Sequence, residues 1–136
     1  MAKKSPPGIA GIIVERYRVF QKRTELEVGA LTLLAGENSA GKSSVMHPLL
    51  LLKQTIEAPL DPGPLLLDGE NVRLTSADQM FSIGSRGPMR FGLRTTEQQR
   101  LELTYSRRDR GGIGLDAMTW QGARGRETTI NARGRW

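Results

Sequence analysis

The chain has 136 residues, which is enough for one domain with a single hydrophobic core. Its 20 lysines and arginines outnumber its 14 acidic residues, and the net charge of +6 favours an anionic partner such as a phosphate group. With no cysteine and one histidine, His47, the sequence excludes disulfides, thiolate metal sites and zinc sites built from histidines.

The N-terminal residues are charged, but the pattern of a signal peptide does not follow them. The short apolar run from Gly8 to Val14 leads into charged residues and has no small-residue cleavage site after it. No apolar run approaches the roughly 18 residues that a membrane helix needs. We therefore expect a cytoplasmic protein with no membrane partner.

Three strands are predicted in the first 35 residues. Ile9–Val14 is a nearly continuous apolar run and predicts a buried strand, after which Tyr17–Phe20 leads into a turn. Thr24–Val28 alternates polar and apolar residues, as a half-exposed strand does. Leu31–Ala35 predicts a third strand, buried, whose end leads into a glycine-rich loop.

The glycine-rich loop, Gly36–Ser44, matches the pattern G-x-x-x-x-G-K-[ST] at every fixed position. Gly36 and Gly41 allow backbone angles that cost other residues too much, so the loop can aim several N–H groups at one point. A helix that begins near Lys42 adds its positive end there. The result is a cradle for the α- and β-phosphates of a nucleotide, with Lys42 reaching the β- and γ-phosphates and the Ser43 hydroxyl binding Mg²⁺.

A chance match in a loop is the alternative, and the apolar strand before the loop and the apolar helix after it argue against that alternative. We therefore predict a nucleotide site in which Lys42 is also the catalytic residue and Ser43 the metal ligand. The predicted binding residues are Gly36, Glu37, Asn38, Ser39, Ala40, Gly41, Lys42, Ser43 and Ser44.

A helix is predicted from Lys42 to Ala58. Pro48 lies past its first turn, where it removes a backbone hydrogen bond. Either the packing of the four leucines that follow tolerates a kink there, or a bent helix shapes a site. A loop follows over residues 59–64.

Asp68–Asn71 predicts a tight turn between two short apolar runs, residues 65–67 and 72–74. Asp68 also ends an apolar run, as does the second Mg²⁺-organising residue of many phosphate-loop proteins. Glu70 could serve as a general base, although a solvated turn residue is the simpler interpretation. The turn composition favours the structural role for both residues.

The second half of the chain is mostly β-like. A short helix is predicted from Ala77 to Phe81, because residues 75–78 have the polar spacing of a helix N-cap. Trp120 is expected to close the core. Alternating patterns predict strands around Phe91 and Leu93, over 101–105, from Ile113 to Ala117 and over 128–130.

Arginines are frequent in the second half of the chain. They could neutralise the phosphates of a nucleic acid, or they could form a solvated face of the predicted sheet. Few aromatic residues accompany them, so a base-stacking platform is weakly supported. These arginines are Arg86, Arg90, Arg94, Arg100, Arg107, Arg108, Arg110, Arg124, Arg126, Arg133 and Arg135.

The loop and its flanks resemble ABC-class ATPases, most closely the branch that holds SMC, RecF and OLD-type proteins and related bacterial AAA-labelled ATPases. The resemblance covers roughly residues 8–75. It rests on residues 31–44 with Asn38 in the loop, on Leu49–Gln54, on the corner Glu15–Phe20 and on the turn region 65–74. It implies an α/β P-loop NTPase fold: one incomplete ATP-binding domain, 1–136, with an N-terminal lobe, 8–58, and a β-rich antiparallel subdomain, 59–136.

The same resemblance implies ATP and Mg²⁺ as ligands, with ATP held between two such units, so a homo-oligomer or a completing ATPase subunit is expected. Members of this group often act on DNA or in defence against phage. No Leu-Ser-Gly-Gly signature, no strand ending in Asp-Glu and no switch histidine follows residue 75. Gln98 and Gln99 are unanchored candidates for the γ-phosphate-sensing glutamine.

These departures imply that the chain binds ATP but hydrolyses it poorly alone. Two other functions stay open at this point. One is a small kinase or phosphotransferase that uses Asp68 to hold magnesium. The other is a non-catalytic subunit whose assembly responds to nucleotide.

Overall fold

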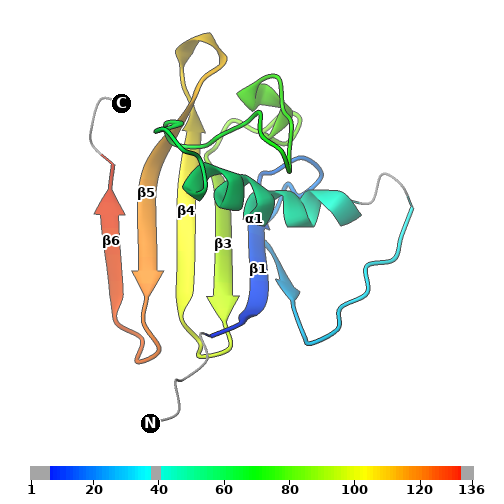
Figure 1. Cartoon of the computed structure of the whole chain (residues 1–136), viewed down its shortest axis with the longest axis vertical. Coiled ribbons are helices and arrows are strands. Elements are labelled where there is room, and N and C mark those ends of the chain that lie inside the picture. The colour runs from blue at the N-terminus through cyan, green and yellow to red at the C-terminus, as the bar shows by residue number, and fades with distance from the viewer. Residues whose placement is uncertain (1–6, 38–40, 133–136) are drawn as a thin grey trace.

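The computed structural model describes residues 7–37 and 41–132. A six-stranded sheet with the order β2-β1-β3-β4-β5-β6 forms its frame, and helix α1 crosses one face of that sheet (Figure 1). All pairings between the described strands are antiparallel. The strands are β1 (Ile9–Glu15), β2 (Thr24–Glu27), β3 (Met89–Thr95), β4 (Arg100–Arg107), β5 (Ile113–Gln121) and β6 (Glu127–Asn131); the helices are α1 (Lys42–Ile56) and the short 3₁₀ turns η1 (Ala77–Gln79) and η2 (Asp109–Gly111).

The strands form where apolar and polar residues alternate or where an apolar run is bounded by charge. One row across the helix-side face reads Val14, Phe91, Leu103 and Met118, each opposite the next in register. The strands predicted near residues 9–14, 24–28, 91–93, 101–105, 113–117 and 128–130 are thereby confirmed. Of the short helix predicted over residues 77–81, only the 3₁₀ turn η1 forms.

Helix α1 begins at Lys42, as predicted, and ends at Ile56, two residues before the predicted end. It runs through Pro48 without interruption, and Pro48 is buried. The buried positions Val45, Pro48, Leu51 and Gln54 recur every three residues, so one stripe of the helix faces the sheet. This packing supports the interpretation in which the core tolerates the proline.

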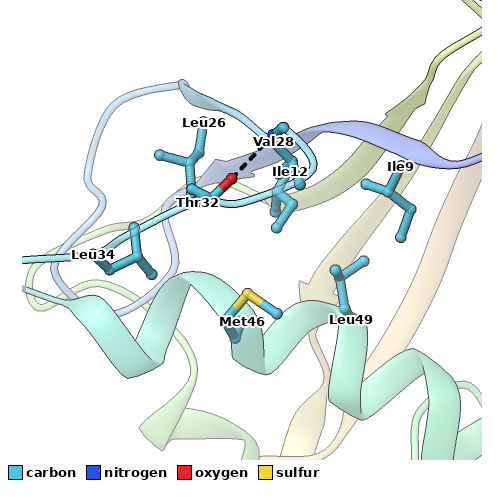
Figure 2. A pocket seen from close by; sticks show the side chains of 9 residues that line it. Ile9, Ile12, Leu26, Val28, Thr32, Leu34, Met46 and Leu49 are labelled. Carbon is cyan, nitrogen blue, oxygen red and sulfur yellow. Dashed lines mark hydrogen bonds between the residues drawn. The ribbon is translucent and has the colours of Figure 1, made fainter.

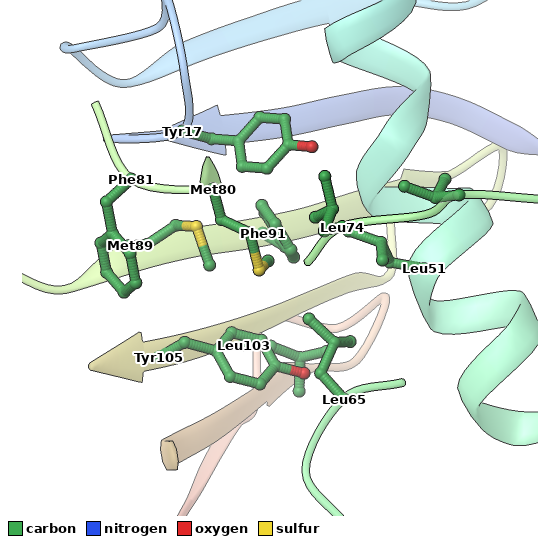
Figure 3. Close-up of a cluster of buried hydrophobic side chains, with 11 residues drawn as sticks. Tyr17, Leu51, Leu65, Leu74, Met80, Phe81, Met89, Phe91, Leu103 and Tyr105 are labelled. Atoms are coloured by element: carbon green, nitrogen blue, oxygen red, sulfur yellow. The ribbon is translucent and has the colours of Figure 1, made fainter. Parts of the chain in front are cut away.

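The main core lies between α1, the sheet and residues 65–82, which cover the same face (Figure 3). Phe91 is at its centre, with ring centroids 5.1 Å from Tyr17 and 5.8 Å from Tyr105. A second, smaller cluster joins Ile12 and Val14 to Val45 of the helix. The buried members of the main core are Tyr17, Leu51, Leu65, Val72, Leu74, Met80, Phe81, Met89, Phe91, Leu103 and Tyr105.

The prediction of a buried strand over Leu31–Ala35 is wrong. The segment has no regular secondary structure, and the side chains of Leu31 and Leu33 are 81% and 83% exposed. An apolar run becomes a buried strand only if a neighbouring strand pairs with its backbone, and the described chain supplies none here. Leu34 instead covers an apolar cavity of about 310 Å³ between α1 and strands β1 and β2, opposite Met46 (Figure 2).

Trp120 does not close the core as predicted, because its side chain is 41% exposed. It lies on β5 opposite Leu101 of β4 and Thr128 of β6. Helix α1 crosses β1, β3 and β4 and does not reach this part of the sheet (Figure 1).

No helix in the described ranges is long and apolar enough to cross a membrane.

The face of the sheet opposite α1 carries a network of ion pairs. Arg94 binds Glu25 and Glu27 of β2, Arg100 binds Glu25 at 3.2 Å, and Glu102 accepts from Arg23. The hydrogen bonds from Arg94 and Arg23 lower the pKa values of Glu25 and Glu102 respectively. These side chains lie over strand β1, whose outward residue on this face, Ile13, is fully buried.

We expect Glu102→Gln to weaken the dependence of stability on pH. The folded pKa of Glu102 lies below its ordinary 4.5, so its contribution is present above that pH and is lost as the pH falls through the lower folded value. Urea unfolding at pH 7 and pH 3.5 measures this, with Glu57→Gln in the exposed pair with Lys53 as the control. An equal fall in stability for wild type and Glu102→Gln would contradict the assignment.

Candidate functional site

The N-terminus of α1 is open to an anion. Its N-cap is Gly41, with φ +88°, and no side chain of a described residue caps the first turn. The first turn contains no acidic residue either. The N–H groups at the start of the helix therefore have no acceptor among the described side chains, and they carry the positive end of the helix dipole.

Gly41 is required here for two reasons. A residue with a side chain rarely adopts its positive φ, and a Cβ at this position would lie 2.6 Å from Cγ2 of Val19. The ring of Phe20 lies against the same position at 3.1 Å. The corner after β1 is thereby placed in contact with the start of α1, and the predicted role of Gly41 in the turn of the loop is consistent with this conformation.

Lys42 folds back onto the loop that precedes it. Its ammonium donates to the carbonyl oxygen of Gly36, and to that of Glu37 at 2.8 Å. Gly36 itself has a φ of +153°. The cation therefore lies at the mouth of the loop, where a bound phosphate would replace the two carbonyl oxygens as its partner.

The remaining predicted site residues divide into three groups. Ser43 is exposed in the first turn of α1, whereas Ser44 is buried. Asn38, Ser39 and Ala40 lie outside the described residues. The described part of the chain has no cluster of three or more His, Asp or Glu side chains suited to a metal. The Mg²⁺ site predicted at Ser43 needs no such cluster, because the Ser43 hydroxyl and the nucleotide phosphates would supply ligands.

A cavity of about 550 Å³ lies beside this helix terminus. Val19 joins the two, because it lines the cavity and also contacts Gly41. Arg18 brings a guanidinium to the cavity, and the apolar side chain of Ile83 is 95% exposed there. Volumes of this size hold small organic ligands. The full lining is Arg18, Val19, Gln21, Asp78, Gln79, Phe81 and Ile83.

Asp68 lies at the other end of α1 from the loop. The turn predicted at Asp68–Asn71 is confirmed. Asp68 and Arg73 form an isolated antiparallel β-bridge between their backbones, and the amide of Gly69 donates to the Val72 carbonyl at 3.0 Å. This turn rests on Gln54. Gln54 and Ser43 are separated along the helix axis by roughly 16 Å.

That separation is too large for Asp68 and Ser43 to share one Mg²⁺ ion. Glu70 lies in the same turn, exposed, and lines a different cavity next to Gln54. Gln98 and Gln99 lie in the turn between β3 and β4, next to Gly8 at the start of β1, whereas the loop contacts the corner beyond the end of β1. None of these four residues is brought to the loop.

Many arginines of the second half are engaged with carboxylates. Arg107 binds Asp78 and stacks on the Phe81 ring with 4.1 Å to its centroid, and Arg108 binds Asp116. Arg90 binds Glu15, and Arg94 and Arg100 belong to the network on the outer face. This pairing favours the interpretation as a solvated, self-neutralised face over a nucleic-acid surface. Arg133 and Arg135 lie outside the described residues.

Sequence reasoning did not single out Arg18, which lines the cavity beside the start of α1, or His47, whose Nδ1 atom lies 3.4 Å from Nη1 of Arg18. Arg18 lies in the predicted turn, and His47 lies on the predicted helix, where a lone histidine usually belongs to the packing. The signal that could have found Arg18 is the corner Glu15–Phe20, whose family resemblance does not by itself say which of its side chains lies near the loop.

A comparison with curated proteins finds similarity over part of the chain. A stretch of 60 residues is 42% identical to "Ribose import ATP-binding protein RbsA 2" of Agrobacterium fabrum (strain C58 / ATCC 33970). The stretch covers 44% of this chain and 11% of that protein, so the chain spans only a small part of the length of its relative. No protein-family profile matches the chain, and no solved structure matches it.

Proposed function

We propose that the chain binds Mg·ATP through the loop Gly36–Ser44. The observation that carries the proposal is the open N-terminus of α1, with the Lys42 ammonium folded over the mouth of the loop. The loop amides and the helix terminus hold the phosphates, Lys42 neutralises their charge, and Ser43 completes the coordination of Mg²⁺. The nucleoside extends into the cavity beside Val19.

The proposed fold class is an α/β P-loop domain of the ABC type, 1–136, with the loop and first helix in residues 8–58 and a β-rich subdomain in 59–136. Strands from both parts, β1 and β2 as well as β3–β6, belong to one antiparallel sheet. The similarity to an ATP-binding protein supports the ATP-binding function, and the sequence motif supports the class. The narrower placement in the SMC, RecF and OLD-type branch, with a cytoplasmic role in DNA maintenance or phage defence, rests on the corner Glu15–Phe20 and on Asn38 alone.

Within this proposal, the chain alone is a poor ATPase. Hydrolysis needs a group that orients or deprotonates water near the γ-phosphate, and no described carboxylate is assigned there. A further lobe, a second subunit or a second copy would supply it. The segment Leu31–Ala35 supports such completion, because Leu31 and Leu33 are exposed and no described strand pairs with its backbone, so an added strand could do so. The position of Asp68 disfavours the kinase alternative.

Lys42→Ala is the test. Loss of one charge-assisted contact should weaken Mg·ATP binding by about ten- to a hundredfold in calorimetric titration. Lys53→Ala is the matched control, because Lys53 lies on the same helix and forms an exposed ion pair with Glu57. Phosphate release, followed in the same samples, should be negligible for all three proteins.

Three results would contradict the proposal. Equal affinity of wild type and Lys42→Ala would remove the loop from binding. Failure of the wild-type chain to bind would overturn the function proposed for this chain. Steady phosphate release would contradict the poor turnover and return attention to Asp68 and Glu70.

A further inference from the structure

His47 joins helix α1 to the corner after β1. Its Nδ1 atom lies 3.1 Å from the Tyr17 hydroxyl and 3.4 Å from Nη1 of Arg18. The Tyr17 ring meets the imidazole edge-on, with the two planes at 82°. One nitrogen of the only histidine in the chain therefore contacts a buried phenol and a guanidinium at once.

The chemistry of these partners sets the state of the imidazole. A guanidinium can only donate hydrogen bonds, so its contact with Nδ1 requires that nitrogen to be unprotonated. Burial and the nearby charge of Arg18 both lower the pKa of His47. Burial raises the pKa of Tyr17 to about 12, so the phenol keeps its proton. His47 is thus a neutral acceptor whose proton resides on Nε2.

Arg18 differs from the arginines of the sheet. Within the described chain, no carboxylate pairs with it, whereas Arg23, Arg94 and Arg107 each bind one. Its side chain contacts the carbonyl oxygen of Gln79 at 3.3 Å and Nδ1 of His47, both neutral acceptors. Asp78 also lines this cavity but binds Arg107, so the Arg18 guanidinium has no ion-pair partner among the described residues where the cavity adjoins the start of α1.

We propose that His47 is a positioning residue that holds Arg18 at the rim of this cavity, so that the guanidinium meets the bound nucleotide. The inference rests on the proposed function, and it extends the site to a helix face that the loop motif does not include. The acceptor on His47 and the Gln79 carbonyl limit the rotation of a long side chain before the ligand arrives. Affinity is gained because less side-chain entropy is lost on binding.

The test is a double-mutant cycle in Mg·ATP affinity at pH 8. His47→Leu removes the acceptor and should weaken binding roughly three- to tenfold. Arg18→Leu should weaken it at least as much, and the double variant should be no weaker than Arg18→Leu alone. His47→Gln, which offers a neutral oxygen acceptor, should restore most of the affinity.

Tyr17→Phe is the matched control, because it removes the other partner of Nδ1 and leaves Arg18 in place. It should lower the melting temperature without changing the affinity. If the role of His47 were merely structural, His47→Leu would also lower the melting temperature without changing the affinity. The single imidazole also allows a measurement without nucleotide, since its ¹⁵N chemical shifts should report a proton on Nε2 and none on Nδ1.

Wild-type affinity in His47→Leu, additive losses in the double variant, or a proton on Nδ1 at pH 8 would each overturn the inference. If Lys42→Ala still weakens binding in such a case, the proposed function stands without it. Absence of binding by the wild-type chain would overturn both together.

Discussion

Phe91→Ala is expected to lower the free energy of unfolding by about 3–5 kcal/mol, the range for deleting a fully buried aromatic ring. The Phe91 side chain is completely buried, and its ring meets that of Tyr17 at 75° (Figure 3). Alanine would remove the aromatic contacts and leave a cavity that α1 and the sheet cannot close. Urea unfolding with a linear extrapolation measures the loss.

Trp120→Ala is the matched control for Phe91→Ala. It deletes a larger ring, but from a position that is 41% exposed on β5. We expect a loss of about 1 kcal/mol, because much of the side chain already contacts water. Equal losses for the two variants would contradict the placement of the core between α1 and strands β1, β3 and β4.

Gln54→Ala is the second large effect, with an expected loss of about 2–4 kcal/mol. The buried Gln54 amide donates to the carbonyl oxygens of Leu66, at 2.7 Å, and Val72, at 3.1 Å. Its oxygen accepts from the amides of Val72, at 3.0 Å, and Asn71, at 3.3 Å. One side chain thus satisfies four backbone groups, and buried groups left without partners are costly.

Two further variants sharpen this prediction. Gln54→Glu keeps the shape but faces the Leu66 and Val72 carbonyls with an oxygen in place of the donor, so it should destabilise as well. Lys53→Ala, one residue earlier and exposed, should change stability by less than about 0.5 kcal/mol. A loss of stability for Gln54→Ala as small as that for Lys53→Ala would contradict the role of Gln54 as the support of the turn.

The parts of the fold predicted correctly are those set by local sequence. Alternation, together with the apolar run at Ile9–Val14, predicted the strands, and the Gly41-Lys42 pair predicted a helix start near Lys42, where α1 begins. Leu31–Ala35 and Trp120 were misplaced because burial depends on neighbours, and apolar composition alone does not say whether a neighbour is present. The burial of Gln54 could have been suspected, since it continues the three-residue spacing of Val45, Pro48 and Leu51, but its four hydrogen bonds follow only from the position of the turn.

The site shows the same division. The loop motif predicts roles for Lys42 and Ser43 because a phosphate-binding loop is recognised from one continuous stretch of sequence, and those roles stay a prediction. The contact between His47 and Arg18 joins residues that are 29 positions apart, so it follows only from the packing of α1 on the corner after β1. The assignment of Asp68 to a turn is correct. Its large separation from Ser43 follows only from the structure, because helix α1 lies between the two residues.

The order of the strands also has a consequence during synthesis of the chain. β1 pairs with β3, and Val14 can pair with Phe91 only after the ribosome has added nearly 80 further residues. At roughly 5–20 residues per second, that interval lasts roughly 4–16 s. Val45, which covers Ile12 and Val14, is made much earlier. The small cluster can therefore shield the nascent hairpin of β1 and β2 while the ribosome is still producing the strands that complete the large one.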